Sequence, residues 1–288
     1  MSDYVVRMLA KEAGVRGLGC LTTGLAREGA RRHKTSPVAT VALGQAMTAA
    51  ALMGALLKTR QRVALKFEGD GPLQKIITEA ASNGDVRGYV AVPDVPQERQ
   101  WGAFAVPQAL GRDGLLTVVK DLRLRELYQG IVPLQAGDIE TDLAYYLNQS
   151  EQIPSVLAMG VQLDEEEQVA AAGGILIQAI PPYNPAIVHA LGERVAELPP
   201  FEELLAQGYT PEAVFELVFD NIAIKLLGQQ PLYFQCSCSR ERSQQALASL
   251  GRDELDSLLT QEGEAVVDCH FCHERFVFSR EDLEAMLL

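Results

Sequence analysis

The segments LYFQCSCSRERSQQ (residues 232–245) and VVDCHFCHERFVF (residues 266–278) hold four of the five cysteines in this chain of 288 residues. They form one Cys-x-Cys pair and one Cys-x-x-Cys pair, with thirty residues between the pairs. Zinc in structural sites takes four tetrahedral ligands, and thiolate sulfurs bind it at about 2.3 Å. Two close pairs that fold back on each other therefore predict a site for one Zn²⁺, with four ligands: Cys236, Cys238, Cys269 and Cys272.

The segment around these cysteines, residues 231–288, is predicted to be a small C-terminal zinc-binding domain. Its patterns predict a helix over 239–250, strands over 265–267 and 275–278, and a final helix that begins with a capping box at Ser279. Fewer than about 60 residues bury little core, so the metal would hold the fold together. Four thiolates fill the ligand shell, so His270 and His273 are expected to lie beside it.

Residues 1–182 are predicted to form an α+β domain of mixed sheet and helix. The chain is expected to open with a helix, and residues 37–57 contain no charged side chain. That length is sufficient to span a bilayer, but its threonines, glutamine and glycines favour a buried helix. Turn signals at 68–72 and 83–85 indicate an antiparallel meander. Further strands are predicted at 114–119, 130–134 and 170–180, a helix is predicted at 138–149, and the lone Cys20 is expected in the core.

Residues 183–230 lack β-rich runs and are rich in acidic residues at helical spacing. Thr210 followed by Pro211 is a good start for a helix, and Pro199 and Pro200 divide the region into short pieces. Helices this short are marginally stable in water unless they pack on a neighbour. We therefore predict a metastable helical linker.

The charge of the chain limits its partners. The formal net charge is −13 and the sequence pI is about 4.8, which disfavours nucleic acid and anionic membranes as partners. Residues 231–288 contain five arginines against eleven acids, which disfavours a zinc ribbon that binds nucleic acid. Charged residues interrupt the N-terminus, so no secretory signal is expected. The expected compartment is the cytoplasm, where thiols stay reduced.

An enzymatic role has little support in the sequence. His33 stands alone between Arg32 and Lys34 and is expected at the surface rather than as a catalytic base. The chain has no GxxxxGK[ST] loop, and Gly17-Leu-Gly19 lacks the third glycine of a dinucleotide fingerprint. We predict that the protein is not an enzyme.

The cysteine cluster has two interpretations that the spacing leaves open. One is a constitutive structural zinc site. In the other, an oxidant that attacks one sulfur finds a second thiol nearby, and each disulfide removes two metal ligands. Metal binding supplies roughly 10–16 kcal/mol to small zinc folds, so its loss would unfold the domain and remove support from the linker.

Several segments resemble one family, the redox-regulated heat-shock holdase chaperones of the thirty-three-kilodalton class. CSCSRER and DCHFCHERF are similar to its C-terminal zinc motif, and FEGDGPLQ and NGDVRGYV to its N-terminal hairpins. HKTSPVATVALGQAMTAAALMG resembles its long buried helix, YYLNQSEQIPS its central helix and turn, and AAGGILIQAIP its last sheet strand. The resemblance extends over nearly the whole chain.

The resemblance implies a function. The reduced, zinc-loaded form would be inactive. Peroxide with heat, or hypochlorous acid, would pair Cys236 with Cys238 and Cys269 with Cys272 and expel zinc. The linker would then unfold, and the protein, often as a homodimer, would hold unfolding clients without ATP and later pass them to ATP-dependent foldases.

Overall fold

Alternating apolar residues after residue 62 build a six-stranded sheet, with Val63, Leu65 and Phe67 buried on one face of its central strand. The computed structural model describes residues 2–96, 99–100 and 103–287. The strand order is β13-β5-β4-β3-β8-β9, antiparallel except between β13 and β5. The predicted meander is therefore confirmed. The strands are β3 (Arg62–Glu68), β4 (Lys75–Ala81), β5 (Asp85–Val90), β8 (Leu115–Asp121), β9 (Tyr128–Pro133) and β13 (Tyr233–Phe234).

A second, five-stranded antiparallel sheet has the order β10-β11-β2-β1-β12. The predicted N-terminal helix is wrong, because β1 and β2 are strands that pair from Tyr4 with Leu21 to Ala10 with Val15. Pairing in the middle of a sheet outweighs the local sequence preference of this stretch. The strands are β1 (Tyr4–Ala10), β2 (Val15–Leu21), β10 (Ser155–Leu163), β11 (Val169–Ala179) and β12 (Lys225–Pro231), and a small β6–β7 ladder (Arg99–Gln100 and Ala103–Phe104) stands apart.

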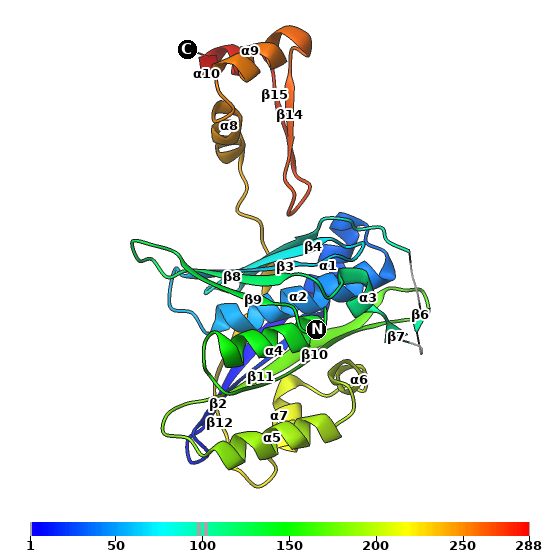
Figure 1. Ribbon diagram of the computed structural model, residues 1–288, viewed down its shortest axis with the longest axis vertical. Helices are drawn as coiled ribbons and strands as arrows, with labels where there is room; N and C mark the ends of the chain where they lie inside the picture. The colour runs from blue at the N-terminus through cyan, green and yellow to red at the C-terminus, as the bar shows by residue number, and fades with distance from the viewer. Residues whose placement is uncertain (1, 97–98, 101–102, 288) are drawn as a thin grey trace. The chain divides into compact units, whose positions relative to one another are not determined.

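A layer of helices fills the space between the two sheets (Figure 1). The charge-free segment forms α2 (Pro37–Ala55), and sixteen of its nineteen residues are buried. Although α2 is long and apolar enough to cross a membrane, 89% of its apolar window is covered by the protein, as in a core helix. The predicted buried helix is confirmed. Its companions are α1 (Thr23–His33), α3 (Val106–Leu110) and α4 (Ile139–Gln149).

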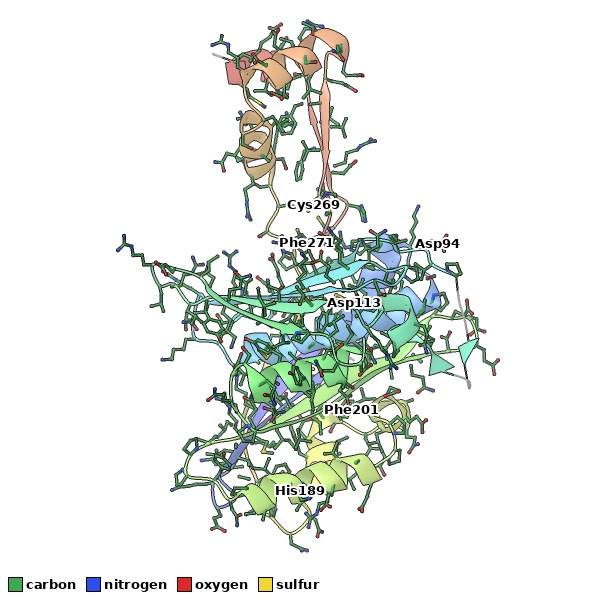
Figure 2. All side chains as sticks on the ribbon, in the orientation of Figure 1. Asp94, Asp113, His189, Phe201, Cys269 and Phe271 are labelled. Carbon is green, nitrogen blue, oxygen red and sulfur yellow. The ribbon has the colours of Figure 1, made fainter. Side chains whose placement is uncertain are left out.

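The region predicted as the linker packs on the other face of the five-stranded sheet (Figure 1), and Figure 2 labels two of its side chains, His189 and Phe201. It forms α5 (Pro185–Glu197), α6 (Phe201–Ala206) and α7 (Pro211–Phe219), and Thr210 caps α7 by accepting a hydrogen bond from the Ala213 amide. The expectation that 183–230 lacks strands is wrong at its end, where β12 pairs with β1. This region lies in the first of two compact units, which ends at Gln235; the second begins at Cys236. The domain boundaries at 182 and 230 stay predictions.

The second unit has a small core of its own. Leu247, Leu255, Ala265, Phe278 and Leu283 are buried together, which is little apolar volume for an independent fold. Its elements are α8 (Arg240–Ala248), α9 (Arg252–Gln261), β14 (Ala265–Asp268), β15 (Arg275–Phe278) and α10 (Arg280–Leu287). The predicted strands and final helix are confirmed, whereas α9 was not predicted.

Two single residues test the sequence-based expectations about burial. Cys20 is fully buried, as predicted, and burial raises the pKa of its thiol. The prediction for His33 is wrong: its side chain is 6% exposed, and Nε2 lies 2.9 Å from the Gly88 carbonyl oxygen. Lys34 follows the end of α1 and is exposed, whereas His33 contacts β5 of the six-stranded sheet through Gly88.

Candidate metal centre

The turn between β14 and β15 carries one pair of cysteines. The Cys269 amide donates to the Glu274 carbonyl at 3.0 Å, and the His273 amide donates to the Cys269 carbonyl at 2.8 Å. His273 adopts a left-handed backbone conformation with φ 56°, which tightens the turn. These contacts bring Cys269 and Cys272 to the same end of the hairpin.

The other pair precedes α8. Ser239 caps this helix by accepting a hydrogen bond from the Arg242 amide, so the chain leaves Cys238 in an extended conformation. The Arg242 guanidinium donates at 2.8 Å to both the carbonyl and the hydroxyl oxygen of Ser237. The residue between the two cysteines is thereby held to the first turn of the helix, which fixes the direction of both sulfurs.

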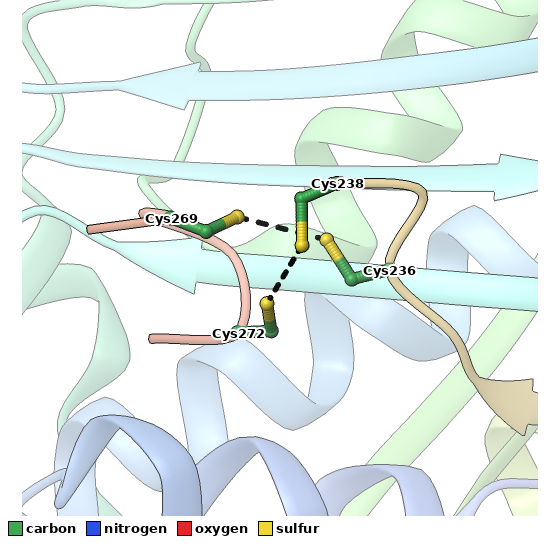
Figure 3. Close-up of side chains that lie close together, drawn as sticks. All are labelled: Cys236, Cys238, Cys269 and Cys272. Atoms are coloured by element: carbon green, nitrogen blue, oxygen red, sulfur yellow. Dashed lines mark hydrogen bonds between the residues drawn. The ribbon is translucent and has the colours of Figure 1, made fainter. Parts of the chain in front are cut away.

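Figure 3 shows the four sulfurs converging from these two segments. All four lie within 4.8 Å of one another, with 3.6 Å between Cys236 and Cys269 and 3.3 Å between Cys238 and Cys272. Four thiolates at about 2.3 Å from a tetrahedral ion would be about 3.8 Å apart. The cluster therefore fits a metal ion with four sulfur ligands. His270 and His273 are outside this group, as expected.

Two of the cluster thiols, those of Cys238 and Cys272, have raised pKa values and resist ionisation. Burial raises the pKa of the Cys272 thiol to about 11, and burial with the neighbouring sulfurs raises that of Cys238 as well. Metal ligands must be thiolates, so binding of a cation here releases protons and weakens in acid.

Arg240 connects the cysteine segment to the rest of the second unit, and the sequence analysis did not assign it this role. Its guanidinium donates to the Val277 carbonyl and to Asp282, each at 2.7 Å, and lies 4.4 Å from the centre of the Phe278 ring. Arg240 lies close to Cys238 in the sequence, but the residues that its guanidinium contacts lie about forty positions further on. No local sequence pattern indicates these contacts.

The comparisons with known proteins agree with this fold and site. The Hsp33 protein family matches residues 3–279. The chain is 50% identical to the 33 kDa chaperonin of Geobacter sulfurreducens, covering 99% of this chain and 95% of the relative. It is 39% identical to that of Geobacillus kaustophilus, covering 99% and 98%.

A solved structure gives the same result. The crystal structure of the 33 kDa chaperonin (heat shock protein 33 homolog) from Thermotoga maritima matches with a TM-score of 0.90 and 34% identity, covering 99% of this chain and 97% of that one. An α+β unit followed by a four-cysteine unit thus defines a heat-shock chaperone, as the sequence resemblance implied. The chain belongs to the Hsp33 family and is a chaperone rather than an enzyme.

Proposed function

We propose that this protein is a redox-regulated, ATP-independent holdase of the cytoplasm that becomes active when its clustered cysteines are oxidised. In the reduced state its own linker covers the surface that binds clients. In the oxidised state the linker unfolds and unfolding proteins bind in its place, which protects cells against oxidative stress and heat.

The metal in this proposal is one Zn²⁺, with Cys236, Cys238, Cys269 and Cys272 as its ligands. Four sulfur donors without a carboxylate select a soft or borderline cation. When bound, zinc keeps the four cysteine sulfurs as thiolates and joins the two segments that carry them. Its binding contributes folding free energy to the second unit. The distances between the four sulfurs support this assignment.

The redox step uses only the four thiols and an oxidant such as hydrogen peroxide. Two thiols give one disulfide, and the two electrons and two protons that they lose reduce one peroxide to two waters. We propose the pairs Cys236 with Cys238 and Cys269 with Cys272, which join neighbours within each segment. Both segments then lack thiolates, so a metal ion no longer joins them.

Loss of that connection should unfold the second unit, because among its described residues the core is small, with five buried apolar side chains and half-buried ones packed against them. Residues 231–288 would be the switch domain, and the linker over 183–230 would unfold with it. The short helices of the linker are stabilised by packing rather than by length: α6 has six residues and α7 nine.

The surface that would be exposed is large and apolar. The linker helices are buried against those strands of the five-stranded sheet that belong to residues 1–182. The buried residues of the helices include Phe201, Leu204, Phe215 and Phe219, and those of the strands include Val6, Met8, Val15, Ile175 and Ile177. Separation of the two exposes both surfaces, and exposed apolar patches of this kind bind unfolded chains or a second copy. A second copy on this surface would give the proposed homodimer of the oxidised state, and we propose that bound clients later pass to ATP-dependent foldases.

The convergence of four sulfurs on a unit with a minimal core is the observation that carries this proposal. The test follows zinc release and light scattering of a heat-denatured client together during peroxide treatment. We expect one zinc per reduced chain, its release on oxidation, and suppression of aggregation only afterwards. A Cys20→Ala variant is the control, because Cys20 is buried in the core and should leave the switch intact. Equal suppression by reduced and oxidised protein would refute the redox switch.

A further inference from the structure

Three loops meet at one end of the six-stranded sheet. The register pairs Arg62 with Ala81 and with Asp121, so the α2–β3 loop, the β4–β5 turn and the β8–β9 loop lie at the same end. In Figure 1 this is the end from which the β8–β9 loop projects to the left. The loops enclose an open cleft of about 850 Å³, a volume within the range of small-ligand sites.

The cleft is strongly basic although the protein is acidic. Its lining contains five cationic side chains and one acid, Asp85, in a chain whose net charge is −13. Asp121 lies beside the cleft and pairs with Arg62 at 3.1 Å and with Arg123 at 3.6 Å. We call this site the basic cleft and define it by its cations: Arg7, Lys58, Arg60, Arg62 and Arg123.

The loops of the basic cleft are held mainly by backbone atoms and by Gln61. The Arg123 Nε donates to the Arg60 carbonyl at 2.6 Å. The Gln61 side chain accepts from the Lys58 amide at 2.9 Å and donates to the Leu122 carbonyl at 3.0 Å. Lys58 and Arg60 thus contribute backbone groups to the loop structure, and their side-chain charges remain available.

Arg7 lies half-buried in the middle of β1. Its guanidinium donates to the Ala55 carbonyl at 3.2 Å and to the Gln230 side chain at 2.8 Å, and both acceptors are neutral. Within the described part of the chain, no carboxylate forms an ion pair with Arg7, Lys58 or Arg60. Three positive charges without an ion-pair partner, against the single lining acid Asp85, favour an anionic ligand in the cleft.

We propose that the basic cleft binds a short oligophosphate, either an inorganic chain or the phosphates of a nucleotide. Guanidinium and ammonium groups bind phosphate oxygens through charge-assisted hydrogen bonds, and several cations favour a ligand with several negative charges. A long polyanion would extend from the cleft onto a surface that repels it. A chain of a few phosphates fits both the volume and the local charge.

The test measures binding of inorganic tripolyphosphate to the reduced full-length protein by titration calorimetry at low salt. We expect saturable binding of one ligand per chain, with amide NMR shifts at residues 57–62, 81–85 and 123. The double variant Lys58→Gln, Arg60→Gln should bind at least about tenfold more weakly, because two charge-assisted contacts are lost.

The matched control is Arg31→Gln, Arg112→Gln, which removes the same charge from exposed positions outside the basic cleft. The control should bind like the unchanged protein. Absence of saturable binding, or equal weakening in both double variants, would overturn the proposal.

Titration with ATP under the same conditions distinguishes the two sources. Affinity similar to that of tripolyphosphate indicates recognition of phosphates alone, whereas tighter binding indicates a nucleotide. In either case the Lys58→Gln, Arg60→Gln variant should bind both ATP and tripolyphosphate more weakly than the unchanged protein does. Because binding is measured without oxidant, this result is independent of the proposed redox switch.

Discussion

Phe215 of α7 offers the sharpest test of the role that the linker plays. Its side chain is fully buried, and its ring packs edge-on against Phe219 with 6.2 Å between centroids. A Cβ atom built on Gly17 or Gly19 of β2 would lie 3.0 or 2.9 Å from this ring, so the ring rests directly on the strand. Phe215→Ala removes this contact and leaves a cavity between the linker and the five-stranded sheet.

Truncation of a buried phenylalanine to alanine costs about 3–5 kcal/mol. Every 1.4 kcal/mol is a factor of ten, so the linker should open more often by about two to three and a half powers of ten. Native-state hydrogen exchange of residues 185–219 measures this opening in the reduced protein. Light scattering of a heat-denatured client measures the consequence, which we expect to be partial suppression of aggregation without oxidant.

Leu217→Ala is the matched control, because Leu217 lies on the same helix and is 43% exposed. It should change stability by less than about 0.5 kcal/mol and leave the protein inactive when reduced. If Phe215→Ala increases exchange across the linker but gives no suppression, opening of the linker is insufficient for activity, and the proposed mechanism is wrong.

Three further predictions concern the metal centre, pH and the attachment of the linker. Cys238→Ser leaves three thiols, so purified protein should contain much less than one zinc per chain; full zinc occupancy would show that Cys238 is no ligand. Burial, with Asp138 and Glu202 nearby, raises the pKa of Glu140 from 4.5 to about 7, so the folded protein binds the extra proton and stability falls as pH rises through this interval. The free energy of unfolding in urea, measured at pH 5 and at pH 7.5, should fall by about 2 kcal/mol less in Glu140→Gln than in the unchanged protein. The same pH dependence in both proteins would contradict this assignment. The Tyr4 hydroxyl donates to Glu212 of α7 at 2.7 Å, so Tyr4→Phe should weaken linker docking by about 1–2 kcal/mol, and unaltered hydrogen exchange in α7 would contradict this.

The metal centre and the central helix could be predicted from sequence because their signals are local. Two cysteine pairs have little use other than a shared ion or disulfides, so convergence of all four sulfurs follows from their spacing. An uncharged segment as long as α2 must be covered by something, and the two sheets cover it. The alternation of apolar and polar residues along the strands of the meander likewise indicates which face of the sheet is buried.

The parts that the sequence did not predict depend on distant partners. β2 contains Gly17 and Gly19, which weaken the local preference for a strand, and the distant Phe215 packs on both of them. β12 exposes nearly all its side chains, so it lacks alternation and is a strand only because β1 pairs with it. Nothing around His33 indicates that the Gly88 carbonyl lies beside it.

The strip of chain from β12 to β13 has a mechanical consequence. It pairs with β1 of one sheet and then with β5 of the other, and Cys236 follows almost at once. A force applied at Cys236 would act first on the pairing of β13 with β5 and then on that of β12 with β1, because β13 is nearer to Cys236 in the chain. Leu232 is buried between these strands in the sequence, and Phe234 packs against the same core, with the Arg32 guanidinium 5.0 Å from the centre of its ring. The force needed to start release should therefore depend on these two side chains.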